Sequence, residues 1–539
     1  MKLVLRLTTL ALVSVFGFSL FALNHAPAAS QDGGGTYRAG FRDGCVQSSL
    51  ITTCGHRLDA TVMQPLAAIR WTADGLQPLL AESWQVEEDG RVFIFNLREG
   101  VTWHDGEPFT ADDVIFSFNA YANPAVGSRW ADKLSQVAGY AEFQAGEADS
   151  LVGVTKVDDL TVRVELASPA PLWLELSQIY IVIFPEHILG EVPPEELVGH
   201  SFWTNRIGTG PFRWANYEPD QFIELERNAD YFLGAPQLER IIYQIYSDAN
   251  THVAALENGE IDSIAYETLL LPVTEVGRLL DREGIFVKPT QDAGLPSFLR
   301  LNSELDIFAD ERVRQAMMYA IDRQAIVDSL WEGYARVANT FFPQEWTWAE
   351  DMNTYAYDPD RARELLEEAG WDSSREIDFV YHYGDSLSAD LIVVMQQYLA
   401  DVGIIVNPRR LDPAVINEMY LDGSFELGYF ALGIGLDPSA GETMIGCGTL
   451  LAFSYCNERV DELFDLGLST ADRDERAVYY QEISQILNEE VPAVWLWYQV
   501  RPMAFSTRVD GLVEHWQEQP VILFNLPVYN EIETWSVSE

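Results

Sequence analysis

Two short stretches of this chain contain residue types that catalysis or phosphate binding would require. His104 is followed directly by Asp105, and a histidine oriented by a carboxylate can activate a nucleophile. Neighbours in sequence seldom orient one another, however, and no serine or cysteine elbow accompanies this pair. Gly208-Thr209-Gly210 is rich in glycine but lacks the lysine and the spacing of a phosphate-binding loop. We expect it to form a tight crossover near a hinge between two lobes.

Carboxylates and histidines point to no catalytic or metal centre. Asp and Glu number 83, so a pair of carboxylates at glycosidase spacing is available on paper in any fold. An exported hydrolase is therefore an alternative function for this chain, but no residue pattern in the sequence specifically indicates it. The eight histidines show no cluster. We expect no enzymatic activity, no bound metal and no cofactor.

The four cysteines form two local pairs, each enclosing eight residues. The pairs are Cys45 with Cys54 and Cys447 with Cys456. In an exported chain two small-loop disulfides are the economical interpretation, although four cysteines permit three connectivities. Zinc binding is less favoured, because neither pair has the short gap of a zinc knuckle.

The charge balance excludes two kinds of partner. Lys and Arg number 34 against 83 Asp and Glu, which gives a formal net charge of -49. A field of that sign opposes nucleic acid and anionic membrane surfaces, both of which need a basic face. The plain explanation is a solvated acidic surface, and the field should bias any ligand towards neutral or cationic species.

The elements around the histidine are clearly marked. Arg91–Arg98 alternates apolar and polar residues, as a half-buried strand does. Thr110 can cap a following helix, whose first-turn aspartates suit the positive helix end. Asp105 and Gly106 are typical of the turn that would join this strand to this helix.

The second half of the chain predicts a parallel sheet. Asp358-Pro359 and Gly370 delimit a short helix by cap, first-turn proline and terminal glycine. Strands and helices then alternate, which favours a parallel sheet covered by helices. Such sheets bind ligands at the carboxyl ends of their strands, so the loop 433–437 is a good place for contacts. The expected elements are strand 377–381, helix 390–402, strand 404–407, helix 413–421 and strand 427–432.

The first 28 residues are typical of an export signal. Lys2 and Arg6 precede an apolar run, Leu7–Leu23, and the small-residue site Ala26-Pro27-Ala28. We expect cleavage near Ala28 and a periplasmic location, with an uncleaved anchor as the alternative. No cysteine follows the run, so a lipid anchor is not supported, and no later segment is long and apolar enough to span a bilayer. A chain of 539 residues should fold into two or three lobes.

Three stretches resemble the family 5 extracellular solute-binding proteins of ABC transporters, a group that includes oligopeptide, dipeptide, nickel and some oligosaccharide binders. The resemblance keeps the family order and covers nearly the whole mature chain. The matching segments are Leu80–Trp84 with Phe93–Val114, Gly208–Phe212 with Leu225–Asn228 and Leu256–Asp262, and Val313–Arg323 with Tyr357–Pro359 and Leu365–Trp371.

This resemblance implies an α/β, two-lobed periplasmic binding-protein fold of type II with an extra inserted subdomain. The lobes would be hinge-linked around a ligand cleft, and the ligand would bias the open–closed equilibrium by contacting both lobes when closed. The closed shape would be read by the transmembrane subunits of an ABC permease, and we expect a monomer. The implied regions are 31–68, 207–290 and 505–539 for the first lobe, 69–206 for the insert and 291–504 for the second lobe.

Family position also suggests ligand contacts. Aromatic rings can stack on peptide planes or sugar faces, and arginines and an aspartate can offer polar contacts. Core packing or a surface charge is the alternative role for each of these side chains. The candidates are Trp130, Trp346, Trp497 and Tyr498 among the aromatic residues, and Arg42, Asp43, Arg300 and Asp437 among the charged ones.

One departure from the family pattern bears on the ligand. Peptide-binding relatives carry an acidic residue a few positions before a proline in the loop after a second-lobe strand, and here that position is Ile434. A buried ammonium without a counter-charge is costly. Either Asp437 substitutes, or the ligand has no free amino terminus. We expect a short peptide, with an oligosaccharide, an opine or a chelated metal as alternatives.

Overall fold

The structure is a computed structural model of the whole chain. It describes residues 35–41, 46–69, 76–177, 181–264, 271–289, 295–433, 437–449, 455–513 and 531–538, with the backbone alone at 53–57, 69 and 175–176.

A seven-stranded mixed sheet organises the region that we call the first lobe. β1 lies at its centre and pairs in parallel with β10 and β11, because both partners enter from the same side after long connections. β19 pairs antiparallel with β11 and β12. The strands, in sheet order, are β12 (Ile285–Lys288), β19 (Met503–Ser506), β11 (Ser263–Ile264), β1 (Thr36–Phe41), β10 (Arg240–Ile245), β9 (Phe222–Arg227) and β8 (Phe212–Glu218).

A four-stranded antiparallel sheet forms the inserted region, in the order β4 (Ala81–Glu87), β5 (Val92–Leu97), β7 (Thr161–Glu165) and β6 (Val154–Asp158). The half-buried strand predicted at 91–98 is β5. Its alternating apolar side chains enter a core that is shared with the first lobe. The helices of this region are α2 (Ala111–Ala122), α3 (Tyr140–Gln144), α4 (Trp173–Ser177), α5 (Glu186–Leu189) and α6 (Pro194–Leu197); the first lobe has α1 (Thr53–Val62), α7 (Ala249–Glu257) and α8 (Val273–Leu280).

A six-stranded sheet organises the second lobe. Its predicted parallel part is confirmed, since β15 pairs in parallel with both β16 and β17. The strands, in sheet order, are β14 (Arg336–Val337), β18 (Ala493–Tyr498), β13 (Pro296–Leu301), β17 (Leu427–Ala431), β15 (Glu376–Tyr381) and β16 (Ile405–Arg410). The helices are α9 (Asp306–Ala309), α10 (Glu311–Ala320), α11 (Arg323–Leu330), α12 (Pro359–Ala369), α13 (Ser386–Asp401), α14 (Pro413–Asp422), α15 (Glu442–Ile445), α16 (Glu458–Leu468) and α17 (Arg473–Glu490). Two further two-stranded sheets pair β2 (Ala67–Ile69) with β3 (Leu76–Pro78) and β20 (Val509–Asp510) with β21 (Ser536–Val537).

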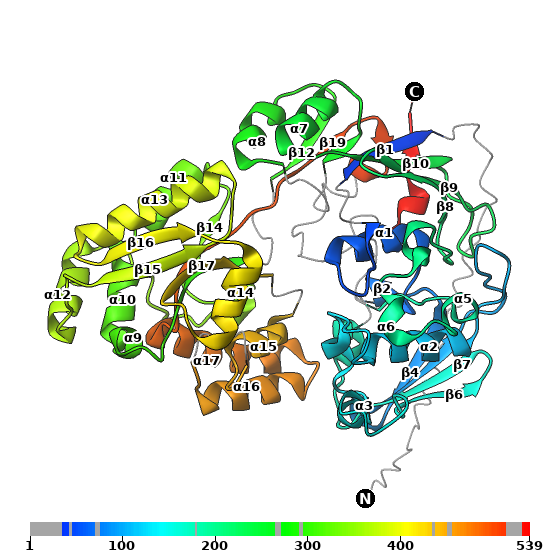
Figure 1. Cartoon of the computed structure of the whole chain (residues 1–539), viewed down its shortest axis with the longest axis horizontal. Helices are drawn as coiled ribbons and strands as arrows, with labels where there is room; N and C mark the ends of the chain where they lie inside the picture. The colour runs from blue at the N-terminus through cyan, green and yellow to red at the C-terminus, as the bar shows by residue number, and fades with distance from the viewer. Residues whose placement is uncertain are drawn as a thin grey trace, which may run out of the picture.

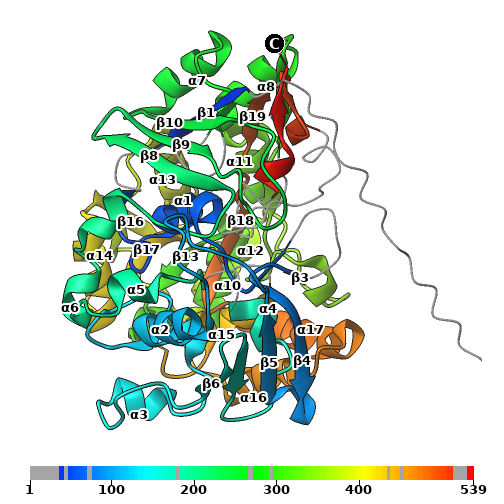
Figure 2. The same ribbon diagram turned by 90° about the vertical axis from the view of Figure 1, so that its right-hand side faces the viewer.

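The two lobes stand side by side and are joined at one end of the molecule (Figure 1). The chain passes between them from β12 to β13 and returns from β18 to β19. The first lobe and the insert share one apolar core, and a smaller cluster lies under α7 and α8 of the first lobe. The second lobe has a separate core, to which the first lobe contributes Val273 of α8. The molecule therefore has the construction of two bodies connected by two chain segments. Figure 2 shows the first lobe stacked on the insert.

Local signals set the predicted helix boundaries. Thr110 caps α2 in a capping box, with its side chain accepting from the Asp112 amide and Asp113 accepting from the Thr110 amide. Asp358 caps α12, and Gly370 ends it in the left-handed conformation at φ 73°. These boundaries are fixed by the unpaired amides and carbonyls of helix ends, which side chains and glycine satisfy locally.

The glycine-rich stretch 208–210 does not lie at the hinge between the lobes, where the sequence predicted it. Gly208 and Gly210 form a tight crossover, but they lie against α1 and the insert, away from the two segments that join the lobes. A Cβ at Gly208 would lie 1.8 Å from the carbonyl oxygen of Val62. Both ring nitrogens of His104 bind this stretch: Nδ1 accepts from the Gly208 amide at 3.1 Å and Nε2 donates to the Gly210 carbonyl at 3.0 Å. The expected crossover therefore joins the first lobe to the insert.

Candidate functional site

The carboxyl ends of the central strands face the junction of the lobes. In the second lobe β15, β16, β17 and β18 run in one direction, and β18 leads directly into the segment that returns to the first lobe. In the first lobe β12 runs in the direction of β1, β10 and β11, and leads into the other joining segment. Ligands of open α/β sheets bind in the crevice outside such edges. The space between the two edges is therefore the candidate site.

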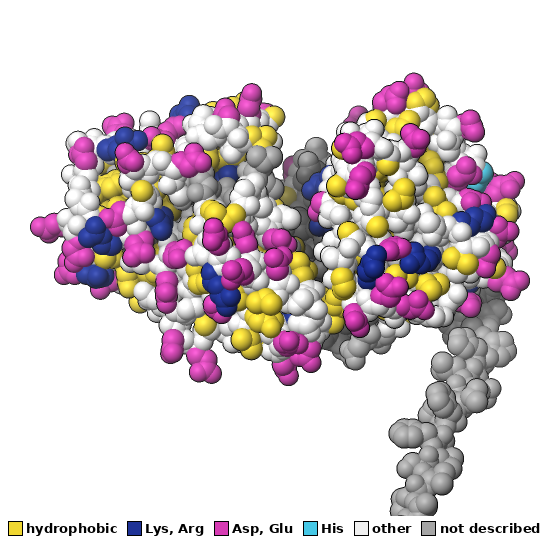
Figure 3. Space-filling view, turned by 90° about the horizontal axis from the view of Figure 1, so that it is seen from below, with side chains coloured by type: hydrophobic (Ala, Val, Ile, Leu, Met, Phe, Trp, Pro, Cys, Tyr) yellow, Lys and Arg dark blue, Asp and Glu magenta, His cyan; other side chains and the backbone are white. Residues whose placement is uncertain are grey.

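A furrow separates the lobes in the space-filling view from below (Figure 3). On the first-lobe side, the chain that follows β1 lines a recess of about 420 Å³. Both apolar and polar residues line it. The lining residues are Val46, Gln47, Ser48, Ile51, Val198, Gly199, His200, Trp203, Thr204 and Tyr217.

An ion pair lies behind this recess. Arg206 and Asp59 are fully buried, with Nε and Oδ1 at 2.8 Å, and Arg206 also donates to the Gln47 carbonyl at 3.0 Å. Burial raises the pKa of Asp59 to about 6, against the opposing charge of Arg206. The pair ties α1 and the recess wall to the chain that leaves the insert, so this wall is rigid.

A row of rings follows the second-lobe edge. His382 and Tyr383 directly follow β15 and have ring centroids 4.0 Å apart. Tyr383 meets Tyr429 at 5.4 Å, and Tyr429 meets Trp497 at 6.4 Å. The Tyr383 hydroxyl accepts a hydrogen bond from the Ala431 amide at 2.9 Å, which fixes the ring over the end of β17. His382 and Tyr383 are the partly exposed members, whereas Tyr429 and Trp497 are buried.

Positive charge gathers at the same edge. Arg410 ends β16 opposite Tyr381 of β15, and its guanidinium lies 3.2 Å from the position that a Cβ of Gly384 would take. Within the described parts of the chain, Arg410 is exposed and makes no hydrogen bond or ion pair. Burial raises the pKa of Tyr383 to about 12, although the nearby charge of Arg501 acts in the opposite direction.

The carboxylates closest in sequence are engaged in helix caps, although the charge of Asp385 still acts on the Tyr383 hydroxyl. Asp385 accepts from the Ser388 amide at 2.8 Å and Asp412 accepts from the Ala414 amide at 2.9 Å, so each caps a helix. The edge can therefore offer a guanidinium and partly exposed rings to a ligand. A guanidinium and aromatic rings can bind a ligand through charge-assisted hydrogen bonds and stacking.

Trp497 and Tyr498 of the predicted contacts lie at this edge but inside the lobe. Both are fully buried on β18. Trp497 belongs to the ring row and also meets Trp331 at 6.2 Å. The Tyr498 hydroxyl lies within hydrogen-bonding distance of the Thr340 and Phe342 carbonyls, at 2.8 Å and 2.7 Å, and its ring stacks on Trp348. In this conformation both support the edge from behind.

Trp346 and Asp437 are brought together by Arg476. Arg476 donates to both carboxylate oxygens of Asp437, at 2.7 Å and 2.6 Å, and its guanidinium lies 5.8 Å from the Trp346 ring centroid. Trp346 also packs edge-on against Tyr480 at 5.7 Å. The charge of Asp437 is therefore already balanced, so in this conformation it does not offer an unpaired carboxylate to a ligand ammonium.

Trp130 and Arg300 lie apart from the edge. The Trp130 ring is buried, and its Nε1 donates to the Ser49 carbonyl at 2.8 Å. Arg300 is buried on β13 with its guanidinium 4.2 Å from the Tyr420 ring centroid, and burial lowers its pKa to about 10. These contacts are those of packing. Arg42, Asp43, Ile434, Cys45 and the side chain of Cys54 lie outside the described residues.

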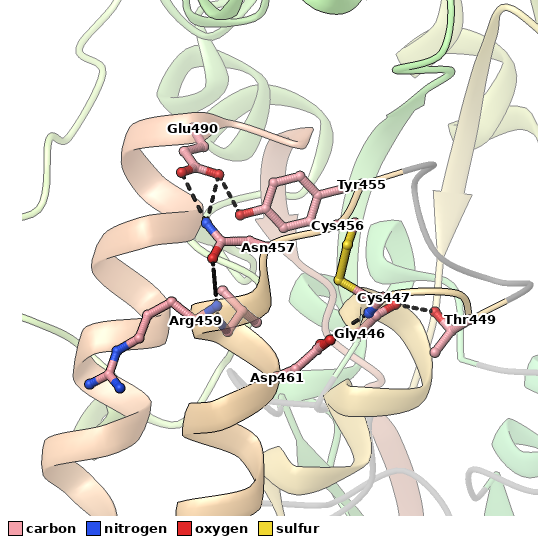
Figure 4. Close-up of a disulfide and its surroundings, with 10 residues drawn as sticks. Gly446, Cys447, Thr449, Tyr455, Cys456, Asn457, Arg459, Asp461 and Glu490 are labelled. Atoms are coloured by element: carbon pink, nitrogen blue, oxygen red, sulfur yellow. Dashed lines mark hydrogen bonds between the residues drawn. A yellow bond between two sulfur atoms is a disulfide. The ribbon is translucent and has the colours of Figure 1, made fainter.

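The predicted disulfide between Cys447 and Cys456 is present (Figure 4). It joins the chain after α15 to the start of α16. The Cys447 amide donates to Asp461 Oδ1 at 3.0 Å, and Tyr455 donates to Glu490 at 2.5 Å. The disulfide and these two hydrogen bonds together hold the chain around the bridge against α16 and α17.

Two features are absent from the described residues. No group of three or more His, Cys, Asp or Glu side chains there could hold a metal ion. No described helix combines the length and apolar character that a bilayer crossing requires.

His382, Tyr383 and Arg410 were not singled out from the sequence, although a signal existed. The strands that end at Tyr381 and near Asn407 were predicted, and the carboxyl-edge rule applies to every parallel strand. Only the loop 433–437 was selected, because the order of strands in the sheet could not be derived from the alternation alone.

The two hinge-joined α/β lobes with their facing carboxyl edges define a periplasmic binding-protein fold. Residues 75–446 match the family model of bacterial extracellular solute-binding proteins, family 5 Middle. The chain therefore belongs to this family of solute-binding proteins.

Individual relatives extend over most of the chain. A Brucella melitensis protein provisionally named an ABC transporter peptide-binding protein is 30% identical over 542 residues, covering 98% of this chain and 97% of the relative. Heme-binding protein A of Haemophilus influenzae is 28% identical over 467 residues, covering 81% of this chain and 82% of the relative. The structure of the oligopeptide-binding protein AppA from Bacillus subtilis, in complex with a nonapeptide, aligns with TM-score 0.73 at 24% identity, covering 94% and 99%.

Proposed function

We propose that this protein captures a short peptide in the interlobe cleft and delivers it to the transmembrane subunits of an ABC importer. The observation that carries the proposal is the meeting of two carboxyl strand edges at the two joining segments, with a furrow between the lobes. The peptide class is supported by the Brucella relative and by the nonapeptide complex of AppA.

The same proposal includes the location and the division of the chain. The protein is exported to the periplasm after loss of residues 1–28 and acts there as a monomer without catalysing a reaction. Membership of an extracellular family supports the location. The proposed division is a first lobe of 31–68, 207–290 and 505–539, an insert of 69–206 and a second lobe of 291–504. The strands of the three large sheets fall within these regions except for β19, which begins in the first-lobe sheet at Met503.

Capture would work by closure of the two lobes around the bound ligand. A peptide that touches Arg410 and the partly exposed rings on one side, and the first-lobe recess on the other, gains all its contacts only when the furrow shuts. It shifts the open–closed equilibrium by that difference in affinity. The permease would then distinguish the closed shape from the open one.

An oligosaccharide is the second candidate, favoured by one contact. Arg476 already balances Asp437, so no free carboxylate is offered there to a peptide ammonium. The rings of His382 and Tyr383 could also stack on sugar faces. A neutral ligand would need no counter-charge at that loop.

Thermal-shift measurements on the full chain separate these classes. Pools of short peptides, oligosaccharides, opines and chelated metals would be tested, because a solute at a hundred times its Kd adds about 2.7 kcal/mol to stability. A rise in Tm with the peptide pool alone supports the proposal, and a rise with the sugar pool alone replaces it with the second candidate. The same pools would be assayed for cleavage, and a turnover product would contradict a binding role.

Two neighbouring arginines allow a matched pair of variants, whose affinities would be measured for the solute that gives the largest rise in Tm. Arg410→Gln should weaken affinity at least about tenfold if Arg410 makes a charge-assisted hydrogen bond to the solute. Arg409→Gln is the control, since Arg409 lies on the same strand as Arg410 but is engaged by Asp378 of the neighbouring strand β15. Equal effects of both changes would remove Arg410 from the site.

A further inference from the structure

The two lobes also touch at a place outside the cleft. Helix α8 of the first lobe has a buried stripe, and the two ends of the stripe enter different cores. Val276 and Leu279 pack with first-lobe residues, whereas Val273 packs in the apolar cluster of the second lobe. One short helix is therefore shared between the two bodies.

The second lobe meets α8 with the turn that follows α11. Tyr334 in this turn is partly buried and packs against the cores of both lobes. At the rim, a Cβ on Gly277 of α8 would lie 3.8 Å from the Glu332 carboxylate. We call the packing of Val273 and Gly277 against Glu332 and Tyr334 the back contact.

The turn is held in a fixed shape. Glu332 and Gly333 have φ of 52° and 78°, so two successive left-handed residues reverse the chain. The left-handed conformation is unfavourable for glutamate, and it persists only where the surroundings hold it. Trp331 provides that hold, since its buried ring packs against Trp497 in the second-lobe core.

The back contact and the cleft lie on opposite sides of the joining segments. In Figure 1, α8 lies at the upper side of the molecule, above the segment that joins β18 to β19. The furrow of Figure 3 is seen from the opposite side, below. When two bodies rotate about such a junction, surfaces on opposite sides of the axis move in opposite directions. Shutting the furrow must therefore part the back contact.

We propose that the back contact opposes closure and holds the solute-free protein open. Its apolar packing exists in the conformation whose furrow is open and is lost on closure, so it adds to the free-energy difference between the two states. Weakening it should raise the closed fraction and, with that fraction, the apparent affinity for any solute that binds the closed form. This deepens the proposed function, because it rests on closure of the two lobes.

The test measures the lobe separation without any solute. Spin labels at Val157→Cys in the insert and Val478→Cys in the second lobe occupy strongly exposed positions. Double electron–electron resonance then reports the distribution of their distances. Tyr334→Ala should move at least about a third of the molecules to a shorter distance. Leu280→Ala, at an exposed position on the same helix, is the control and should leave the distribution unchanged.

A second variant guards against loss of folding. Val273→Ala removes part of the same contact with a smaller side-chain change, and cooperative thermal unfolding of each variant would be verified first. An unchanged or longer distance in folded Tyr334→Ala and Val273→Ala would overturn the inference. That failure would leave solute capture standing, because capture is judged by the thermal shift alone.

Discussion

At the residue scale, the buried side chain of His104 links its own turn to the glycine-rich stretch at Gly208 and Gly210 through hydrogen bonds. Its Nδ1 accepts from the Gly208 amide and its Nε2 donates to the Gly210 carbonyl, so the neutral ring satisfies both backbone groups. Its neighbour Asp105 binds His187 instead, at 2.9 Å. The side chain that first suggested catalysis is therefore a structural link between the insert and the crossover.

This link should make stability depend on pH. Burial lowers the pKa of His104 to about 4 from its usual 6.5. Between these values the unfolded chain binds more protons than the folded one, so the free energy of unfolding falls as pH drops through this window. The loss should reach about 3 kcal/mol at its full extent. Urea unfolding at several pH values between 4 and 7 measures it.

The control for this prediction is His104→Gln, whose amide does not titrate. The variant should lose overall stability but show a shallower decline between pH 6.5 and pH 4. A decline as steep as that of the natural protein would assign the pH dependence to other groups.

The Asp437–Arg476 pair sets a second expectation at this scale. Arg476→Ala would leave a mostly buried carboxylate without its partner, which costs about 3–5 kcal/mol in comparable pairs. Urea denaturation measures the loss. Arg473→Ala is the matched control, since the exposed Arg473 lies over the same Trp346 ring and bears no buried partner in the described contacts. Equal losses would show that the ring contact, not the ion pair, provides the stability.

At the scale of elements, close backbone approach explains the glycines of the crossover. The Gly210 amide donates to the Val62 carbonyl at 2.8 Å, at the end of α1. A side chain on either glycine would enter this backbone. The crossover can be tight only because α1 and the chain that leaves the insert touch through main-chain atoms.

Gly208→Ala should therefore destabilise strongly. Its Cβ would meet the Val62 carbonyl oxygen at 1.8 Å, and the backbone must shift to relieve the overlap, at a cost of at least about 3 kcal/mol. Gly199→Ala is the control, because its nearest neighbour would be 4.0 Å away. A Tm of Gly208→Ala within about 2 °C of the control's would contradict the described approach.

Element boundaries show which signals were local. The helix expected at 390–402 is α13, which begins four residues earlier at Ser386. Asp385 caps it by accepting from the Ser388 amide. The helical repeat of apolar residues begins only at Leu391, so the polar first turn carries no signal of that kind. Strand β16 similarly extends to Arg410, past the apolar part of its sequence.

At the scale of the whole molecule, the net charge of -49 means that the acidic side chains of both lobes repel one another. Such repulsion opposes compactness, and salt screens it over a length of about 10 Å at 0.1 M. We expect Tm to rise by several degrees between 0.01 M and 0.5 M sodium chloride. Differential scanning calorimetry measures it, and a Tm that falls with salt would show that ion pairs outweigh the repulsion.

The sequence alone determined the features that depend on neighbouring residues. Thr110, Asp358 and Gly370 fixed helix ends because caps act within a few residues. The alternation in the second half determined the parallel part of its sheet.

Only the tertiary structure decided which side chains share a surface. Trp497 and Tyr498 occupy the expected edge, yet they are buried, because β18 lies inside the six-stranded sheet. Arg410 and His382 lie at the same edge because β16 pairs with β15, and Asp437 is balanced by an arginine 39 residues away. Strand order and long-range pairing depend on closing loops between distant segments, and no local pattern of residues encodes that outcome.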